Sequence, residues 1–71
     1  MERMELSARN QFKGTVKGIR RGGVVAEVVV DIGNGQEIVS VITNDSVDRL
    51  ALREGSQVTA IVKATEVLLA G

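Results

Sequence analysis

The first stretch of the chain that could do chemistry is Ser7-Ala8-Arg9-Asn10-Gln11, a dense run of polar side chains near the N-terminus. Read as an extended strand, it alternates faces, so that Ser7, Arg9 and Gln11 share one side. Arg9 matters most, because its planar guanidinium matches an oxygen-bearing anion with several hydrogen bonds at once. On these residues alone a solvated strand face is the simpler interpretation, since Arg and Lys side chains are usually exposed.

Two further segments carry hydrogen-bond donors. Lys63 and Thr65 share a face of a predicted strand near the C-terminus. Thr43, Asn44 and Ser46 lie where another predicted strand gives way to a helix, and backbone N–H groups at such a boundary are free to point at an anion. If the three segments converge, within a chain or across an interface, they form a pocket of donors with two positive charges. Such a pocket suits a small dianionic oxyanion held by charge-assisted hydrogen bonds.

The residue types argue against an enzyme. The chain has no His and no Cys, and none of its Ser or Lys residues lies in a recognisable activating context. The carboxylates of Glu27, Asp31 and Glu37 are not paired as an acid and a base, and they are better explained as surface charge. The spacings of a calcium loop, of a phosphate-binding loop and of a dinucleotide-binding loop are all missing. The sequence therefore predicts a protein that is not an enzyme and ligates no metal directly.

The length and composition predict an assembly of several chains. A chain of 71 residues forms one small domain, and it has no Cys for disulfides and no His for a zinc site. Hydrophobic residues nevertheless make up 44% of it, mostly Val, Ile, Leu and Ala, which is more apolar surface than so short a chain can enclose. We expect an obligate homo-oligomer.

The charge balance restricts the partners. Nine basic and nine acidic residues give a formal net charge of zero, so long-range attraction to nucleic acid or to an anionic membrane is not expected. Residues 1–6 lack the apolar region of a signal peptide, and no apolar run approaches the roughly 20 residues that span a bilayer. We expect an N-terminal leader over residues 1–5, a single domain over residues 6–71, and a cytoplasmic location.

The hydrophobic pattern predicts a fold that is all-β with a small α content. The Asn-Gly pair at 34–35, set between two apolar runs, is a strong hairpin signal, and Gly14 and Gly18 are spaced to permit a bend or bulge in the first strand. Strands are predicted over residues 6–19, 24–32, 36–43, 57–65 and 66–70, with one short helix between about 44 and 55. This order is that of a five-stranded OB-like barrel with one short helix between strands 3 and 4.

Barrels of this topology often bind single-stranded nucleic acid, which is the alternative function. Such surfaces use aromatic stacking platforms beside basic grooves. This chain has one aromatic residue, Phe12, which the alternation assigns to the packing face. The nucleic-acid alternative is therefore disfavoured.

Several segments together resemble the Mop domain, the molybdate-binding module of the molbindins. The likeness begins with Ser7-Ala8-Arg9-Asn10-Gln11 followed by Gly14, and it closes with Val62-Lys63-Ala64-Thr65-Glu66-Val67. Matching segments lie between them in order and spacing: 26–29, 39–43, 46–47 and 52–55. The resemblance covers residues 6–69.

The resemblance implies an OB-like fold and a hexamer that holds molybdate or tungstate at subunit interfaces, without an organic cofactor. It assigns the oxyanion site to Ser7, Ala8, Arg9, Thr43, Lys63, Ala64 and Thr65. A second class of site is implied around the threefold axis, for which Ser40 and Asn44 are candidates outside the main set. Because related modules fused to other domains are longer than this chain, the implied role is a stand-alone molybdate store.

Overall fold

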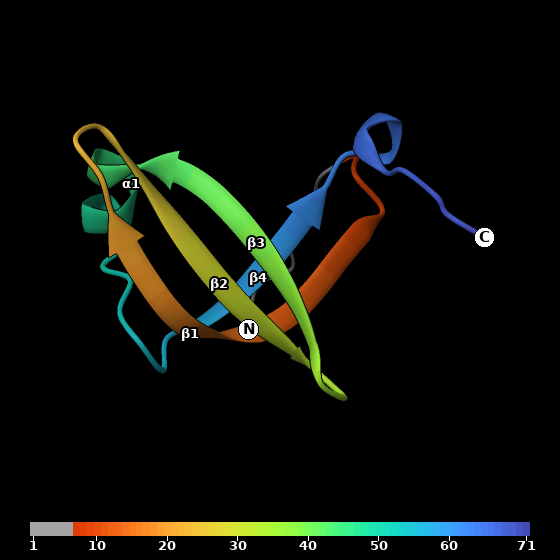
Figure 1. The fold of residues 1–71 in the computed structure, drawn as a ribbon, viewed down its shortest axis with the longest axis horizontal. Helices are drawn as coiled ribbons and strands as arrows, with labels where there is room; N and C mark the ends of the chain where they lie inside the picture. The colour runs from red at the N-terminus through yellow and green to blue at the C-terminus, as the bar shows by residue number, and fades with distance from the viewer. Residues whose placement is uncertain (1–6) are drawn as a thin grey trace.

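The computed structural model describes residues 7–71, which form four strands, one short α-helix and one 3₁₀ turn. The elements are β1 (Asn10–Arg21), β2 (Val25–Gly33), β3 (Gln36–Thr43), α1 (Asn44–Arg49), β4 (Gln57–Val62) and η1 (Ala64–Glu66). The strands form one antiparallel sheet in the order β3-β2-β1-β4, curled into a half-barrel (Figure 1). Among the described residues, no helix is long and apolar enough to cross a membrane.

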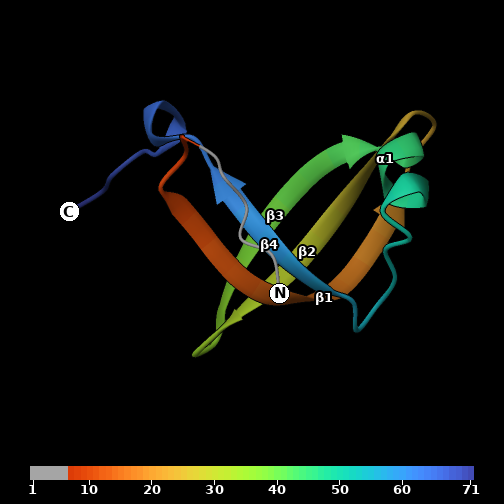
Figure 2. The same cartoon turned by 180° about the vertical axis from the view of Figure 1, so that it is seen from behind.

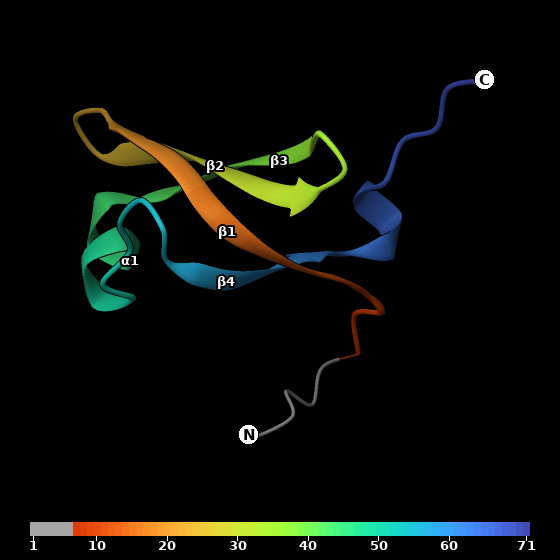
Figure 3. The same cartoon turned by 90° about the horizontal axis from the view of Figure 1, so that it is seen from below.

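The long strand β1 holds the two halves of the sheet together. Its first half, from Asn10 to Thr15, pairs with β4, and its second half, from Thr15 to Arg21, pairs with β2. The strand bends where it changes partner, so that β4 lies beneath the layer of β2 and β3 (Figure 3). A β-bulge at Lys17, between Val16 and Gly18, adds to this bend, as the glycine spacing predicts.

The local sequence explains the turns. Asn34 and Gly35 have φ angles of 57° and 74°, which are the values of a type I′ hairpin turn, and they join β2 to β3 as predicted. Helix α1 starts at Asn44, and its N-cap is Thr43. The helix ends at Arg49, earlier than the predicted stop at Gly55, because the chain enters the left-handed region at Ala51 (φ 53°).

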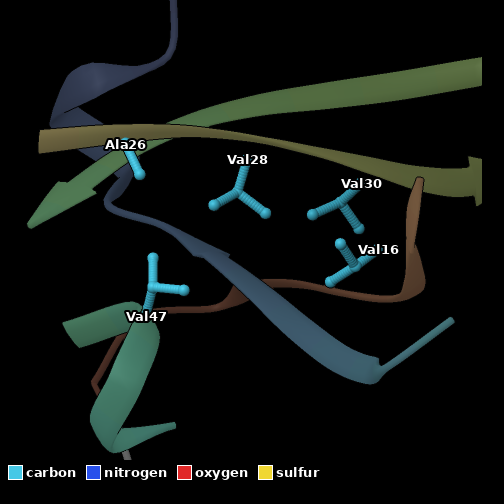
Figure 4. Close-up of a cluster of buried hydrophobic side chains, with 5 residues drawn as sticks. All are labelled: Val16, Ala26, Val28, Val30 and Val47. Carbon is cyan, nitrogen blue, oxygen red and sulfur yellow. The ribbon is translucent and has the colours of Figure 1, made fainter. Parts of the chain in front are cut away.

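The core is small and apolar. It consists of five buried side chains, each 4% exposed or less: Val16, Ala26, Val28, Val30 and Val47. Figure 4 shows Val47 of α1 pointing towards the row of β2 side chains, so the helix closes one end of the half-barrel. The alternation of β2 is confirmed at Ala26, Val28 and Val30, whereas Phe12, expected on the packing face, is 39% exposed.

The prediction of five strands is wrong for the described chain, which forms four. The fourth strand ends at Val62 rather than at residue 65, because residues Ala64–Glu66 form a 3₁₀ turn. The predicted fifth strand over 66–70 does not form, and the tail leaves the sheet as an irregular segment (Figures 1 and 2). A strand needs a neighbouring strand to satisfy its backbone groups, and this tail has none within residues 7–71.

Candidate functional site

Two of the predicted donor segments leave the sheet at the same end. The β1–β4 ladder closes with the pair Asn10 and Val62, so Ser7–Arg9 and Lys63–Thr65 are the chain segments just beyond that pair. Neither segment lies in a strand, which corrects the expectation that their side chains alternate along β1 and β4. The register of the ladder, rather than strand alternation, therefore brings these six residues into one neighbourhood (Figure 3).

Local hydrogen bonds fix the backbone of both segments. Gln11 donates from Nε2 to the carbonyl oxygen of Ala8 at 2.9 Å, which ties the chain back on itself just before β1. On the other side, the N–H of Glu66 donates to the carbonyl of Lys63 at 2.8 Å and closes the 3₁₀ turn. The N–H groups of Ala64 and Thr65 open this turn and therefore have no acceptor inside it.

The charges of Arg9 and Lys63 are available at this end. Both residues are exposed. Within residues 7–71, the ion pairs engage Lys17, Arg20, Arg21 and Arg49, and neither Arg9 nor Lys63 takes part in one. Ser7 and Thr65 are exposed as well, and Ala8 is half-buried. The arrangement offers two cationic groups, two hydroxyls and backbone N–H donors over a short length of chain.

Thr43 lies at the opposite end of the sheet. It pairs with Val25, next to the end of β1 at Arg21, whereas Ser7–Arg9 precede the other end of β1 (Figure 1). The 12 residues of β1 separate the two ends. The hydroxyl of Thr43 already caps α1, because it accepts from the N–H of Ser46 at 3.0 Å and donates to Oγ of Ser46 at 2.9 Å. One chain does not bring Thr43 to the other six residues, so a site that uses all seven needs more than one copy.

The two candidates for the second class of site, Ser40 and Asn44, lie in different parts of the fold. Ser40 is half-buried on β3 and lines a groove. Asn44 opens α1, and its Nδ2 donates to the carbonyl of Gly22 at 2.9 Å, while its buried Oδ1 has no hydrogen-bond partner within the described residues. The unpaired atom is an acceptor, so it suits a donor rather than an anion.

The groove is the feature that the sequence analysis missed. It has a volume of about 290 Å³ and lies between β4 on one side and β2 and β3 on the other. Its lining is mostly Val, Ile and Leu, with Ser40 and Thr59 as the polar residues. The sequence signal for it is that the predicted strands hold more apolar positions than one closed core needs.

The described residues contain no group of three or more His, Cys, Asp or Glu side chains that could hold a metal ion. Among the ionisable groups of residues 7–71, one pKa departs clearly from its ordinary value. The hydrogen bond from Lys17 to Glu37, and the negative charge of that carboxylate, raise the pKa of Lys17. This pair lies on β1 and β3, outside both donor ends, so it contributes to the surface of the sheet rather than to an anion site.

Comparisons with known proteins give a consistent result. The TOBE domain model matches residues 6–69. The chain is 50% identical over 66 residues to molybdenum-pterin-binding protein 2 of Clostridium pasteurianum, covering 93% of this chain and 97% of that protein. Among solved structures, a molybdate-binding protein from Sporomusa ovata has a TM-score of 0.89 and 47% identity, covering 96% of this chain and 100% of that one. The cytoplasmic molybdate-binding protein ModG, with molybdate bound, has a TM-score of 0.83 and 44% identity, covering 86% of this chain and 43% of that one.

Proposed function

The chain belongs to the TOBE domain family, and on this premise we propose that it binds molybdate through hydrogen-bond donors where copies of the chain meet. The observation that carries the proposal is the convergence of Ser7–Arg9 and Lys63–Thr65 at one end of the β1–β4 pair, with Arg9 and Lys63 outside the described ion pairs. Relatives named for molybdate or molybdenum binding support the choice of anion.

In the proposed site each segment has a distinct task. Arg9 supplies a planar pair of donors, and Lys63 supplies a compact second charge, so together they balance the two negative charges of the anion. The backbone N–H groups of Ala64 and Thr65, with the hydroxyls of Ser7 and Thr65, complete the shell around its oxygens. Thr43 joins from another copy, since it lies at the far end of its own sheet. Molybdenum stays inside its shell of oxygens, and the protein needs no direct metal ligand.

We propose the same site for tungstate, which has the same charge and the same tetrahedral shape. Sulfate also carries two negative charges, so its exclusion has to come from the size of the pocket and the geometry of the donors. Equal affinities for molybdate and sulfate would contradict this account of selectivity.

The anion is proposed to bind without a pterin, although relatives carry pterin in their names. A pterin is a flat heterocycle with many polar edge atoms, and sites for such molecules combine stacking surfaces with several convergent polar groups. The groove has Ser40 and Thr59 as the polar residues of an otherwise aliphatic lining and contains no aromatic side chain among its lining residues. Adding a pterin to the protein should therefore leave molybdate affinity unchanged.

We further propose that the chain is a homo-oligomer, a hexamer as in the molbindin family, that stores molybdate in the cytoplasm and acts as a binding protein rather than an enzyme. The accessible surface of 5923 Å² supports assembly, because a compact monomer of 7.6 kDa exposes about 4,300 Å². Apolar side chains on the outer face of β2 and β3 also stay exposed in one chain, at 47% for Val25, 58% for Val39 and 64% for Val41.

The test is calorimetric titration of the purified protein with molybdate, combined with native mass spectrometry in a sulfate-containing control. Arg9→Ala should weaken binding about 10- to 150-fold, because a hydrogen bond to a charged group contributes about 1.5–3 kcal/mol. Arg53→Ala is the matched control, since Arg53 is also exposed and outside the described ion pairs but lies in the loop between α1 and β4. Equal affinities of the two variants would remove Arg9 from the site.

Lys63→Ala should lower the affinity by a similar factor, with Lys13→Ala on β1 as its control. If Lys63→Ala instead lowers the number of chains per assembly in native mass spectrometry, Lys63 is an interface residue rather than an anion ligand.

A further inference from the structure

Gln11 is a polar side chain of the first donor stretch to which the proposed anion site gives no task. Its Nε2 donates to the carbonyl oxygen of Ala8 at 2.9 Å, although the amide is exposed to water. An exposed amide exchanges its hydrogen bonds with water, so a bond back to the main chain acts mainly by ordering that main chain. The segment that it orders, Ser7–Arg9, is one half of the proposed site.

The hydrogen bond starts from a residue that the sheet holds in place. The backbone of Gln11 lies in the β1–β4 ladder opposite Ile61, whereas Ala8 lies two residues before β1 begins. The bond therefore fastens a segment outside the sheet to a residue inside it. The other donor segment is fixed differently, because the 3₁₀ turn that follows Lys63 is closed by backbone hydrogen bonds. The order of Ser7–Arg9 thus depends on a side chain.

The same hydrogen bond sets the direction of a backbone donor. The carbonyl of Ala8 and the N–H of Arg9 belong to one peptide unit, and no peptide bond within residues 7–71 is cis. In a planar trans peptide these two groups point in opposite directions. With the oxygen of Ala8 turned towards Gln11, the N–H of Arg9 is directed away from it, and within residues 7–71 this N–H donates to no backbone acceptor outside the strands.

This orientation suits an anion on the side of the peptide that faces away from Gln11. The peptide dipole has its negative end at the carbonyl oxygen of Ala8 and its positive end at the N–H of Arg9, so an anion is attracted to the second group and repelled by the first. A carbonyl that accepts a hydrogen bond also polarises its peptide, which makes the N–H a stronger donor. The orientation of the peptide further determines the direction in which the side chain of Arg9 leaves the main chain.

We propose that Gln11 is a positioning residue for the oxyanion, which holds the Ala8–Arg9 peptide so that the N–H and the guanidinium of Arg9 both face the anion. Gln11 acts through this peptide rather than by touching the anion, because its amide nitrogen donates to Ala8. This role rests on the proposed molybdate site and adds a residue to it. A segment that is ordered before the anion arrives loses less conformational entropy on binding, so the affinity is higher.

The experiment is calorimetric titration with molybdate of variants that each lose one exposed amide. Gln11→Met keeps the length of the side chain and removes the donor. Gln57→Met is the matched control, because Gln57 is also exposed, lies in the same β1–β4 ladder and donates from Nε2 to Oγ1 of Thr15 at 3.2 Å. Arg9→Ala and the double variant of Arg9→Ala with Gln11→Met complete a double-mutant cycle. Thermal unfolding and native mass spectrometry of each variant check the fold and the assembly.

Gln11→Met should weaken molybdate binding about 2- to 12-fold, which is the factor that corresponds to the net free energy of one neutral hydrogen bond. Gln57→Met should leave the affinity unchanged, although both variants lose one hydrogen bond and should unfold at similar temperatures. In the Arg9→Ala background, Gln11→Met should weaken binding by a smaller factor than in the native chain, because the guanidinium that Gln11 positions is absent.

The positioning role is overturned if Gln11→Met and Gln57→Met bind molybdate equally well. It is also overturned if the losses of Arg9→Ala and Gln11→Met multiply, as those of two independent ligands do, or if Gln11→Met alone reduces the number of chains per assembly. The proposed function is judged separately. It stands if the native chain binds molybdate and Arg9→Ala weakens binding, whatever the result for Gln11, and it fails together with the role of Gln11 if the native chain binds none.

Discussion

Replacing Gly14 by Ala should destabilise the fold more than the size of one methyl group suggests. A Cβ built on Gly14 lies 2.6 Å from the backbone oxygen of Asp31 and 2.6 Å from Cγ1 of Val30. Ordinary contacts between carbon atoms are about 3.5–4.0 Å, so β1 and β2 must separate where β1 changes partner. Overpacking of this kind costs about 1–3 kcal/mol, and we expect the upper end because a backbone atom has to move.

The matched control is Gly18→Ala on the same strand. A Cβ at Gly18 meets no atom within 4 Å, and the φ angle of this residue is outside the left-handed region. Ala restricts the unfolded chain more than Gly does, so this variant should gain about 0.4–1 kcal/mol. Both variants are unfolded with urea and with heat at one chain concentration, because an assembly gains stability with concentration.

We expect the midpoint of thermal unfolding of Gly14→Ala to fall by at least about 12 °C for a loss of 3 kcal/mol, and that of Gly18→Ala to rise slightly. The reasoning is refuted if the two variants differ by less than about 0.5 kcal/mol. Such a result would mean that the close approach of β1 to β2 at Gly14 relaxes freely and does not set the bend of the half-barrel.

Three further predictions concern the sheet and the helix. The pKa of Lys17 is raised by its hydrogen bond to Glu37, so the stabilisation from this pair is present below the ordinary Lys value of 10.5 and is lost as the pH rises through the folded-state pKa. The difference in melting temperature between the native chain and Lys17→Met should stay constant from pH 7 to 9 and then disappear in more alkaline buffer. Thr43→Ala should lower the free energy of unfolding in urea by about 1 kcal/mol, because α1 loses its N-cap. Thr43→Ser keeps a hydroxyl and should recover most of this loss. Equal losses in the two variants would show that the hydroxyl does not stabilise the helix. Val47→Ala should cost about 2–3 kcal/mol, since this side chain is 1% exposed, whereas Leu50→Ala, 65% exposed, should change stability by less than about 0.5 kcal/mol.

The parts of the fold that local sequence determines were predicted well. The Asn34-Gly35 turn, the alternation of β2 and the bulge near Gly18 each depend on residues close together in the chain, and the structure confirms them. The fifth strand was predicted from the apolar pattern of the tail, which is real, but a strand also needs an edge to pair with. Whether such an edge is present depends on other parts of the fold or on another chain, so the sequence of the tail alone does not predict it.

The same contrast between local sequence and the assembled fold applies to the candidate site. The sequence identifies Arg9 and Lys63 by residue type, but strand alternation misplaces them, because neither lies in a strand. The pairing of Asn10 with Val62 brings their segments together, and a register between strands separated by 52 positions follows only from the assembled sheet. The placement of Thr43 at the other end of the sheet is equally a result of topology, and it is the reason why the proposed site takes Thr43 from another copy.

The distance between Thr43 and the paired donor segments has a thermodynamic consequence. If the anion bridges two copies, binding and assembly are linked, and each strengthens the other by the same free energy. Adding molybdate then shifts the assembly towards lower protein concentrations, and diluting the protein lowers its apparent affinity for molybdate. A store built in this way loads when the chain is abundant and empties as the chain becomes scarce, with no hinge or lid to operate it.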